Sequence, residues 1–331
     1  MKSAVAVAIL VTGFVCSCDI MSFAPGDFCV PDYGADEAVG TASPCPSPYA
    51  STSTPESANP PSKPASSTSK PAIASNNIST HSFVFVTTGE TGACGLNSDE
   101  TLECWGNLHA PEGHFLSVSV GCGYACAVRS DQTLLCWGDS SDGQTAAPKG
   151  QFVSVAAGCL YSCAMKADGT VTCWGDTTRG SPPAADLVSI STGLGYACGL
   201  KSDGSLACWG YDLNHTVTPP TGQFISVSAG YTSACGVRTD GTLACWGNDD
   251  PGDLTPPGGT FSAVSVGFFH ACAVKTDETI VCWGNDYDGE TKAPAGRFTS
   301  VATGDWYSCG MRPNGLVACW GDDDAGQASP P

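Results

Sequence analysis

Residues 163–175 read Cys-Ala-Met-Lys-Ala-Asp-Gly-Thr-Val-Thr-Cys-Trp-Gly, and variants of this unit occur seven times in the chain. The Cys-Trp-Gly ending is its most regular part, and each of these cysteines has a second cysteine ten residues earlier. The tryptophans of the seven copies are Trp105, Trp137, Trp174, Trp209, Trp246, Trp283 and Trp320. Self-similarity at a period of 32 to 37 residues indicates a repeat architecture, in which each unit buries its apolar surface against its neighbours.

The two cysteines determine the register of the unit. If Cys163 faces Cys173 across an antiparallel hairpin, Lys166 faces Thr170, and three residues ending in Gly169 remain for the loop. Such a loop is a type I turn followed by a left-handed residue that forms a bulge, and glycine adopts that conformation without steric cost. We therefore predict a disulfide-bonded hairpin with a left-handed Gly169, although three copies carry Glu or Gln in place of this glycine.

Each hairpin is preceded by an alternating apolar run, such as Phe152-Val-Ser-Val155, that reaches a glycine three residues later. Period-two alternation rich in β-branched residues is typical of a strand. A loop and a short fourth segment follow the hairpin, as in residues 138–148. Four short strands in each of seven repeats predict an all-β fold, a seven-bladed β-propeller with an intra-blade disulfide in each blade. A single long β-solenoid is the structural alternative.

The chain has 20 cysteines in 331 residues, which is a high content for a protein of a reducing compartment. Zinc competes with disulfides as an explanation, but structural zinc sites use closely spaced cysteine pairs, and no histidine accompanies the constant spacing of ten. The expected disulfides are Cys94–Cys104, Cys126–Cys136, Cys163–Cys173, Cys198–Cys208, Cys235–Cys245, Cys272–Cys282 and Cys309–Cys319. Cys122 and Cys159 occupy the same position in neighbouring repeats, and a bond between them would join blades 2 and 3.

The N-terminal segment predicts export. Residues 1–17 resemble a signal peptide, because Lys2 precedes an apolar stretch that is too short to span a bilayer. The stretch ends in a pattern similar to a bacterial lipoprotein signal with Cys18 as the lipidated residue; ordinary secretion with cleavage elsewhere is the alternative. Residues 18–80 lack strand or helix periodicity, and their Ser/Thr/Pro-rich part predicts a disordered linker. The propeller is expected over residues 81–331, outside the cell or anchored to its surface by lipid.

Charge and motifs narrow the function classes. The net charge of −19 argues against nucleic acid and anionic lipid as partners, because both favour a basic surface. The five histidines share no repeat position, and the chain lacks His-Glu-x-x-His, Gly-x-Ser-x-Gly and phosphate-binding glycine motifs. The oxygen-rich segments 139–143 and 285–290 could suggest calcium, but Asx-turns explain them more simply. We expect no enzymatic activity, no cofactor and no metal.

The repeat pattern Phe-x-Ser-Val-x-x-Gly, then Cys-Ala-x-Lys-x-Asp-Gly-x-x-x-Cys-Trp-Gly, then Gly-Gln-x-x-x-Pro resembles the regulator of chromosome condensation repeat. The short unit is more similar to that of the secreted bacterial propeller that inhibits β-lactamases, above all in residues 143–158. The resemblance covers residues 82–331 and implies a propeller. It implies no particular target, because propellers of this family bind unrelated partners. The paired cysteines depart from both relatives.

The resemblance also implies where a partner binds. In an up-and-down blade, the loop between the first two strands lies on the same face as the loop between the third and fourth. The first loop varies between repeats, and its equivalents contact the partner in the β-lactamase-binding propeller. The candidate contacts are Leu160, Tyr231, Phe268, Phe269, Asp305 and Trp306. The residue that follows is expected to hold the blade, and is Tyr124, Tyr161, Tyr196, His270 or Tyr307 in five copies.

The second loop adds carboxylates to the same face, and these predict a partner with a basic or mixed surface. They are Asp249, Asp250, Asp253, Asp286, Asp288, Asp322, Asp323 and Asp324. We expect a monomeric protein-binding propeller, with inhibition of an extracellular enzyme such as a β-lactamase as one specific form. A carbohydrate-binding or adhesive surface protein is the second possibility, because exposed aromatic rings also stack on sugars. Guanine-nucleotide exchange, implied by the nuclear relative, is opposed by the signal peptide and the disulfides.

Overall fold

The computed structural model describes residues 77–331, except residues 177–180, 185, 213–214 and 249–254. The expected signal peptide, the lipidation at Cys18 and nearly all of the expected linker lie outside the described residues. Within these residues, no helix has the length and apolar character needed to cross a membrane. The described elements are 22 β-strands, as the alternating sequence pattern predicts.

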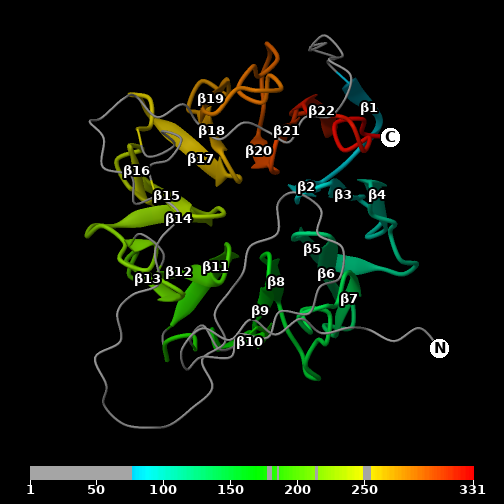
Figure 1. Cartoon of the computed structure of the whole chain (residues 1–331), viewed down its shortest axis with the longest axis vertical. Helices are drawn as coiled ribbons and strands as arrows, with labels where there is room; N and C mark the ends of the chain where they lie inside the picture. Colours follow the sequence, from blue (N-terminus) through cyan, green and yellow to red (C-terminus); the bar gives the residue numbers. More distant parts are fainter. Residues whose placement is uncertain (1–76, 177–180, 185, 213–214, 249–254) are drawn as a thin grey trace, which may run out of the picture. The chain divides into compact units, whose positions relative to one another are not determined.

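The strands form seven antiparallel sheets, which we call blades 1 to 7 in chain order, around a common centre (Figure 1). The innermost strands are β2 (Phe85–Thr88), β5 (Phe115–Val120), β8 (Ser154–Ala157), β11 (Leu187–Thr192), β14 (Phe224–Ala229), β17 (Phe261–Val266) and β20 (Ser300–Thr303). The middle strands are β3 (Gly92–Leu96), β6 (Tyr124–Arg129), β9 (Tyr161–Met165), β12 (Tyr196–Lys201), β15 (Ser233–Arg238), β18 (His270–Lys275) and β21 (Tyr307–Met311). The third strands are β4 (Leu102–Gly106), β7 (Leu134–Gly138), β10 (Val171–Gly175), β13 (Leu206–Gly210), β16 (Leu243–Gly247), β19 (Ile280–Gly284) and β22 (Leu316–Gly321).

The ring closes between blades 7 and 1. Each innermost strand contacts the innermost strand of the next blade, and β20 contacts β2. A further strand, β1 (Asn77–Ser82), pairs antiparallel with β22 and becomes the outermost strand of blade 7. Blade 7 therefore contains residues from both sides of the repeat array, and its first residue lies four positions before the start of the propeller that the repeats predict, at residue 81.

The expectation of four strands in every blade is wrong for blades 1 to 6. In the described residues each of these sheets has three strands, and only the sheet of blade 7 has four. The segment that was expected to form the fourth strand makes turns instead, as in blade 2, where the Gly143 N–H bonds to the Ser140 carbonyl and the Ala146 N–H to the Gly143 carbonyl. Pro148 then ends the segment without a backbone donor.

The hairpin register predicted from the cysteines is confirmed. Cys163 pairs with Cys173, and the Lys166 N–H donates to the Thr170 carbonyl at 2.9 Å across the loop. Gly169 has a φ of +79°. The seven intra-blade disulfides each join Cα atoms 4.0 Å apart. Directly opposed strand positions bring these atoms close together, so each disulfide joins the two strands of its own hairpin.

The three copies without glycine keep the same turn. Glu100, Gln132 and Glu278 have φ values of 68°, 67° and 69°, in the left-handed region that favours glycine. We predict that Gln132→Gly stabilises the protein by about 0.5–1 kcal/mol, because relief of the left-handed strain exceeds the added freedom of the unfolded chain. Gln132 is exposed, so few contacts are lost. Thermal unfolding compares this variant with Gly169→Ala, which should lower the melting temperature. An unchanged or lower melting temperature for Gln132→Gly contradicts the prediction.

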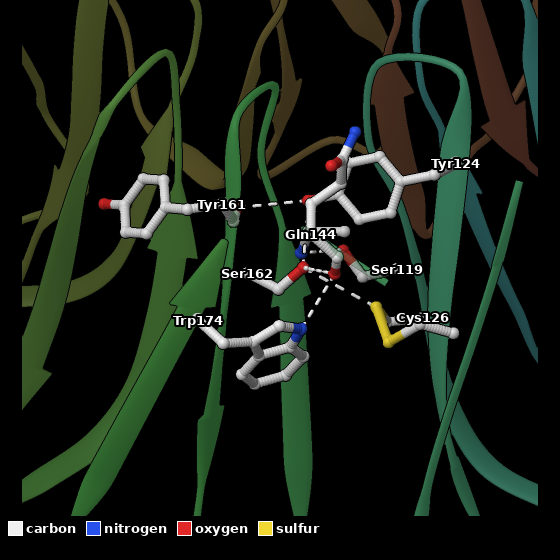
Figure 2. The surroundings of a disulfide bond; sticks show 9 residues. Ser119, Tyr124, Cys126, Gln144, Tyr161, Ser162 and Trp174 are labelled. Carbon is white, nitrogen blue, oxygen red and sulfur yellow. Dashed lines mark hydrogen bonds between the residues drawn. A yellow bond between two sulfur atoms is a disulfide. The ribbon is translucent and has the colours of Figure 1, made fainter. Parts of the chain in front are cut away.

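The core of the molecule lies between blades. One cluster combines Tyr124 and Cys126 of blade 2 with Phe152 and Trp174 of blade 3. Figure 2 shows Tyr124, Cys126 and Trp174 of this cluster. The Tyr124 hydroxyl donates to the Tyr161 carbonyl at 3.1 Å. The Trp174 indole donates to the carbonyl of Gln144, in the segment after blade 2, at 2.7 Å. Blades are thus held to their neighbours by buried rings whose polar ends are hydrogen-bonded.

The same contacts recur around the ring and across its closure. The Tyr196 hydroxyl donates to the Ser233 carbonyl at 2.7 Å, and the Tyr307 hydroxyl of blade 7 donates to the Gly92 carbonyl of blade 1 at 2.7 Å. The Trp105 indole of blade 1 donates to the Gln327 carbonyl at 2.9 Å. These bonds agree with the expected role of Tyr124, Tyr196 and Tyr307 in holding their blades. The buried Tyr161 hydroxyl makes no hydrogen bond to the described residues, so this ring contributes by packing.

Candidate protein-binding face

The first and second loops of each blade are joined by one recurring hydrogen bond. In all seven blades, the residue that follows the third strand of the blade donates its N–H to a carbonyl of the first loop. Examples are Asn285 to Phe269 at 2.9 Å and Asp322 to Trp306 at 2.8 Å. Both loops therefore lie on one face of the propeller, as an up-and-down blade requires. We call this the loop face.

Four of the candidate contacts form a continuous row on the loop face. The Tyr231 ring of blade 5 stacks on Phe268 of blade 6 with centroids 3.6 Å apart. Phe268 and Phe269 have centroids 4.0 Å apart, and Phe269 lies 4.7 Å from the ring of Trp306 in blade 7. Tyr287, from the second loop of blade 6, extends the row with its centroid 5.9 Å from Trp306. We call these five residues the aromatic row.

The aromatic row is partly open to solvent. Its four first-loop members are half-buried, and Tyr287 is 41% exposed. The rings cover one another at their contacts and leave the rest of their surface on the loop face. Large apolar groups at a surface commonly mark an interaction site, whereas scattered single residues do not. A row of five rings from three blades is therefore a candidate for such a site.

Two candidate contacts lie outside the aromatic row. Leu160 belongs to the first loop of blade 3, and no ring contact joins it to the row. Asp305 is half-buried and lines a cavity at the centre of the ring. Sequence reasoning did not name Tyr287 or Glu90 as candidates. Glu90 had a usable signal, because it occupies the same first-loop position as Tyr231 and Asp305, whereas nothing in the sequence indicates where the Tyr287 ring points.

A ring of glycines surrounds the propeller axis. Its members are Gly89, Gly121, Gly158, Gly193, Gly230, Gly267 and Gly304. A Cβ atom on any of them would overlap the carbonyl oxygen of the next glycine in the ring, and the carbonyl that faces Gly304 is that of Gly89. These residues are glycine because the backbones of neighbouring blades approach each other too closely for a side chain.

An axial cavity of about 90 Å³ opens above the glycine ring, between the first loops. Glu90, Tyr231, Phe268 and Asp305 contribute to its lining, so it adjoins the aromatic row. Burial, and then the nearby charge of Glu90, raise the pKa of Asp305 to about 7. Burial also raises the pKa of Tyr231, with further contributions from the charges of Asp305 and Glu90. The cavity therefore combines an aromatic wall with negative charge.

The disulfide between Cys122 and Cys159 also lines the axial cavity. It joins the first loops of blades 2 and 3, with Cα atoms 4.6 Å apart. On the loop face this bond lies across the cavity mouth from the residues of blades 5 to 7. Mass spectrometry of the unreduced protein after proteolysis would detect the linked peptides directly.

The carboxylates of the second loops serve the local turns. The Tyr287 N–H donates to the Asn285 side chain at 3.1 Å, and the Asp288 N–H donates to Glu290 at 2.7 Å. Asp286 forms an ion pair with Lys292 at 2.8 Å. Within the described residues, no three His, Cys, Asp or Glu side chains form a group that could hold a metal ion. Asp249, Asp250 and Asp253 lie outside the described residues.

His270 replaces tyrosine at the interface between blades 6 and 7. It is completely buried, and its Nε2 lies 2.7 Å from the Ser308 hydroxyl. Burial lowers the pKa of His270 from 6.5 to about 4. The unfolded chain therefore binds an extra proton between these two pH values, so the free energy of unfolding decreases as the pH falls from 6.5 to 4. We expect this loss to be as much as about 3 kcal/mol.

His270→Tyr tests this pH dependence. Blade 2 provides the template, because Tyr124 donates to Tyr161 and lies 2.9 Å from the Ser162 hydroxyl, at positions equivalent to Tyr307 and Ser308. The variant should keep its stability at neutral pH and lose less of it between pH 6.5 and 4. Denaturant unfolding at several pH values compares the two proteins, and parallel pH profiles would show that His270 is not the cause. Asp305 titrates in both proteins and cancels in the difference.

Comparison with known proteins finds similar repeats and similar folds. The model of the Regulator of chromosome condensation (RCC1) repeat matches residues 224–252, 261–290 and 298–327, in blades 5 to 7. No curated protein matches the chain. The entire ectodomain of the receptor kinase CR4 from Physcomitrella patens superposes with a TM-score of 0.63 at 25% identity, over 73% of each chain.

Two further solved structures have the same fold. The CRINKLY WD40 ectodomain of the receptor kinase ACR4 from Arabidopsis thaliana has a TM-score of 0.62 at 29% identity, over 77% of this chain and 98% of that one. Prp20p from Saccharomyces cerevisiae has a TM-score of 0.58 at 13% identity, over 72% and 82% of the two chains. At that identity the yeast protein shares the fold alone.

Proposed function

We propose that this propeller of regulator of chromosome condensation repeats is an extracellular protein-binding domain whose partner docks on the loop face through the aromatic row. The observation that carries the proposal is the continuous ring contact from Tyr231 to Trp306 across three blades. Rigid aromatic residues on a surface with a polar rim are common anchors of protein interfaces. Here the rim is supplied by Asp286, Asp288 and the second loop of blade 7.

The compartment is supported by two independent features. Seven intra-blade disulfides, each with at least one buried cysteine, are typical of proteins that fold in an oxidising environment. The two receptor-kinase structures that the chain resembles at 25% and 29% identity are ectodomains. A lipid anchor at Cys18 would hold the propeller at the cell surface. The exchange activity implied by the nuclear relative has no such support, because the yeast structure shares only the fold.

A crosslinking pulldown from the native surface tests the function. The wild-type protein should capture a specific partner, and Phe269→Ala with Trp306→Ala should reduce capture about tenfold or more, because truncated anchors leave unfilled pockets on the partner. Tyr211→Ala is the matched control, since Tyr211 is a 49% exposed aromatic residue of blade 4 outside the aromatic row. Capture that is equal for all three proteins excludes the aromatic row as the binding site.

A glycan array beside the pulldown separates protein from carbohydrate partners. Binding of a glycan that depends on Phe269 and Trp306, with no captured protein, would favour the adhesive alternative. Inhibition of an extracellular enzyme is the more specific form of the proposal, and a β-lactamase activity assay with the purified protein tests the version that the repeat pattern suggests. We expect no catalytic activity of the chain itself. Association with an oppositely charged partner should slow as salt is added.

A further inference from the structure

The axial cavity holds negative charge that the described part of the chain leaves unbalanced. Glu90 and Asp305 line it from the first loops of blades 1 and 7, which are neighbours where the ring closes. Among the described residues, no hydrogen bond or ion pair reaches either carboxylate, and no Lys, Arg or His lines the cavity. Asp305 is therefore a half-buried acid without a counter-charge among these residues, and its partial burial beside a second carboxylate is costly unless something else supplies that charge.

The wall beside these carboxylates is aromatic. Tyr231 and Phe268 both line the cavity, and their rings stack with centroids 3.6 Å apart. Glu90, Tyr231 and Asp305 line the same cavity, and the two charges contribute to the raised pKa of the Tyr231 hydroxyl after burial. A cation is attracted to the face of an aromatic ring as well as to a carboxylate, and an aliphatic stem packs well against the same ring.

The volume of the cavity limits the size of the group that can occupy it. A space of about 10–15 Å³ on this scale holds one water molecule, and the axial cavity has about 90 Å³. It is too large for a single water and too small for a segment of folded chain. The end of one long side chain fits between these limits. The cavity opens on the loop face beside the aromatic row, so a partner docked on that row lies over its mouth.

We propose that the axial cavity receives a lysine or arginine side chain of the protein partner, with its charged group at Glu90 and Asp305 and its stem against Tyr231 and Phe268. The proposal rests on the proposed function, since it names the part of the partner that enters the loop face. Central, desolvated pockets that accept a basic or aromatic anchor commonly carry much of the affinity of an interface. The net charge of −19 steers such a partner toward the protein.

The ionisation of Asp305 gives the site a pH dependence. The titratable groups that face Asp305 are Glu90, Tyr231, Tyr307 and His270. Burial raises the pKa of both tyrosines and lowers that of His270 to about 4, and the pKa of Asp305 is about 7. Raising the pH from 6 to 8 therefore ionises Asp305, and affinity for a cation should increase over this range.

The test uses small analogues of the two side chains on the purified full-length protein. n-Butylammonium and n-butylguanidinium are titrated while the ring resonances of Tyr231 and Phe268 are followed by NMR, with n-butanol as the neutral analogue. We expect the cations to bind and butanol not to bind. Glu90→Gln and Asp305→Asn should each raise the dissociation constant about fivefold or more, because one of two charges is lost. Affinity should rise up to about tenfold from pH 6 to pH 8, and not in Asp305→Asn.

Glu112→Gln is the matched control, because Glu112 is an exposed carboxylate of the segment between β4 and β5 that does not line the cavity. Asp305→Asn removes a charge that burial disfavours, so the variant should fold. Equal binding of butanol, or unchanged cation affinity in both cavity variants, overturns the proposal.

The pulldown separates this proposal from the proposed function. One outcome is capture that depends on Phe269 and Trp306 and yet is unaffected by Glu90→Gln and Asp305→Asn. That result leaves the proposed function intact and overturns the proposal that a basic side chain of the partner enters the axial cavity. Cation binding in the cavity without any protein captured through the aromatic row overturns both, and leaves a site for a small free cation. Capture lost in both sets of variants, with cation binding as expected, supports both.

Discussion

Gly193→Ala should lower the melting temperature by about 10 °C or more. The added Cβ would overlap the Gly230 carbonyl oxygen of the next blade and the Tyr196 ring. Both obstacles are fixed, because the first is backbone and the second is a buried ring whose hydroxyl bonds to the Ser233 carbonyl at 2.7 Å. We estimate a loss of about 3–5 kcal/mol, at the upper end of overpacking effects, and about 2–4 °C per kcal/mol for a domain of this size.

Gly258→Ala is the control for this prediction. A Cβ atom on Gly258 would have no neighbouring atom within 4 Å, and this residue has no left-handed φ, so the same chemical change should be neutral or slightly stabilising. Thermal unfolding by circular dichroism, with disulfides intact, compares the two variants with the wild type. A Gly193→Ala protein that melts within about 2 °C of the wild type would mean that neighbouring blades can separate without cost, and that the glycine ring is not what limits their approach.

The contrast between these two glycines shows what the sequence could predict. The glycine three residues after each alternating run is visible as a repeat position, but its reason is not. Gly193 and Gly230 lie in different repeats, and only the closed ring brings their backbones together. By comparison, the hairpin register needed only the cysteine spacing and the loop length, because both act within 13 residues of one repeat.

The candidate site also has features that the sequence could predict and features that it could not. Tyr231, Phe268 and Trp306 could be named because a repeat offers an internal alignment of its variable positions. That they stack on one another depends on the distance between blades. Asp305 occupies the same first-loop position as Tyr231 and Phe268, and like them it lines the axial cavity, where burial raises its pKa to about 7. The position in the repeat predicts the face, but that Tyr231, Phe268 and Asp305 meet around one cavity follows only from the closure of the ring.

Strand β1, which completes blade 7, was the main feature of the fold that the repeats could not predict. Residues 77–82 have no counterpart in the other six blades, and they follow a Ser/Thr/Pro-rich segment. Their role depends on β22, whose open edge would otherwise expose backbone groups at the far end of the chain. Segments from both sides of the repeat array thus pair in one sheet, so that unfolding of blade 7 requires them to separate.

Removing β1 should therefore destabilise the propeller as a whole. A chain that begins at residue 83 loses the pairing with β22, the 2.8 Å bond from the Thr80 N–H to the Pro331 carbonyl, and the Ser79 hydroxyl that accepts the buried Val317 N–H at 2.9 Å. At about 1 kcal/mol per hydrogen bond, with more for an orphaned buried donor, we expect a loss of about 3–5 kcal/mol. That corresponds to a melting temperature roughly 10 °C below that of a chain beginning at residue 77.

Ser79→Ala in the full-length chain tests the contribution of β1 without truncation. It removes the acceptor for the Val317 N–H together with the 2.8 Å bond that the Ser79 hydroxyl donates to the His81 carbonyl, and should cost about 1–3 kcal/mol. Thr80→Ala is its matched control, because the Thr80 side chain is exposed and its backbone bond to Pro331 is kept. Limited proteolysis should then cut first in blade 7 of the truncated chain. Equal stability of the chains that begin at residues 77 and 83 would show that the contacts of β20 with β2 and of Tyr307 with Gly92 are sufficient to close the ring.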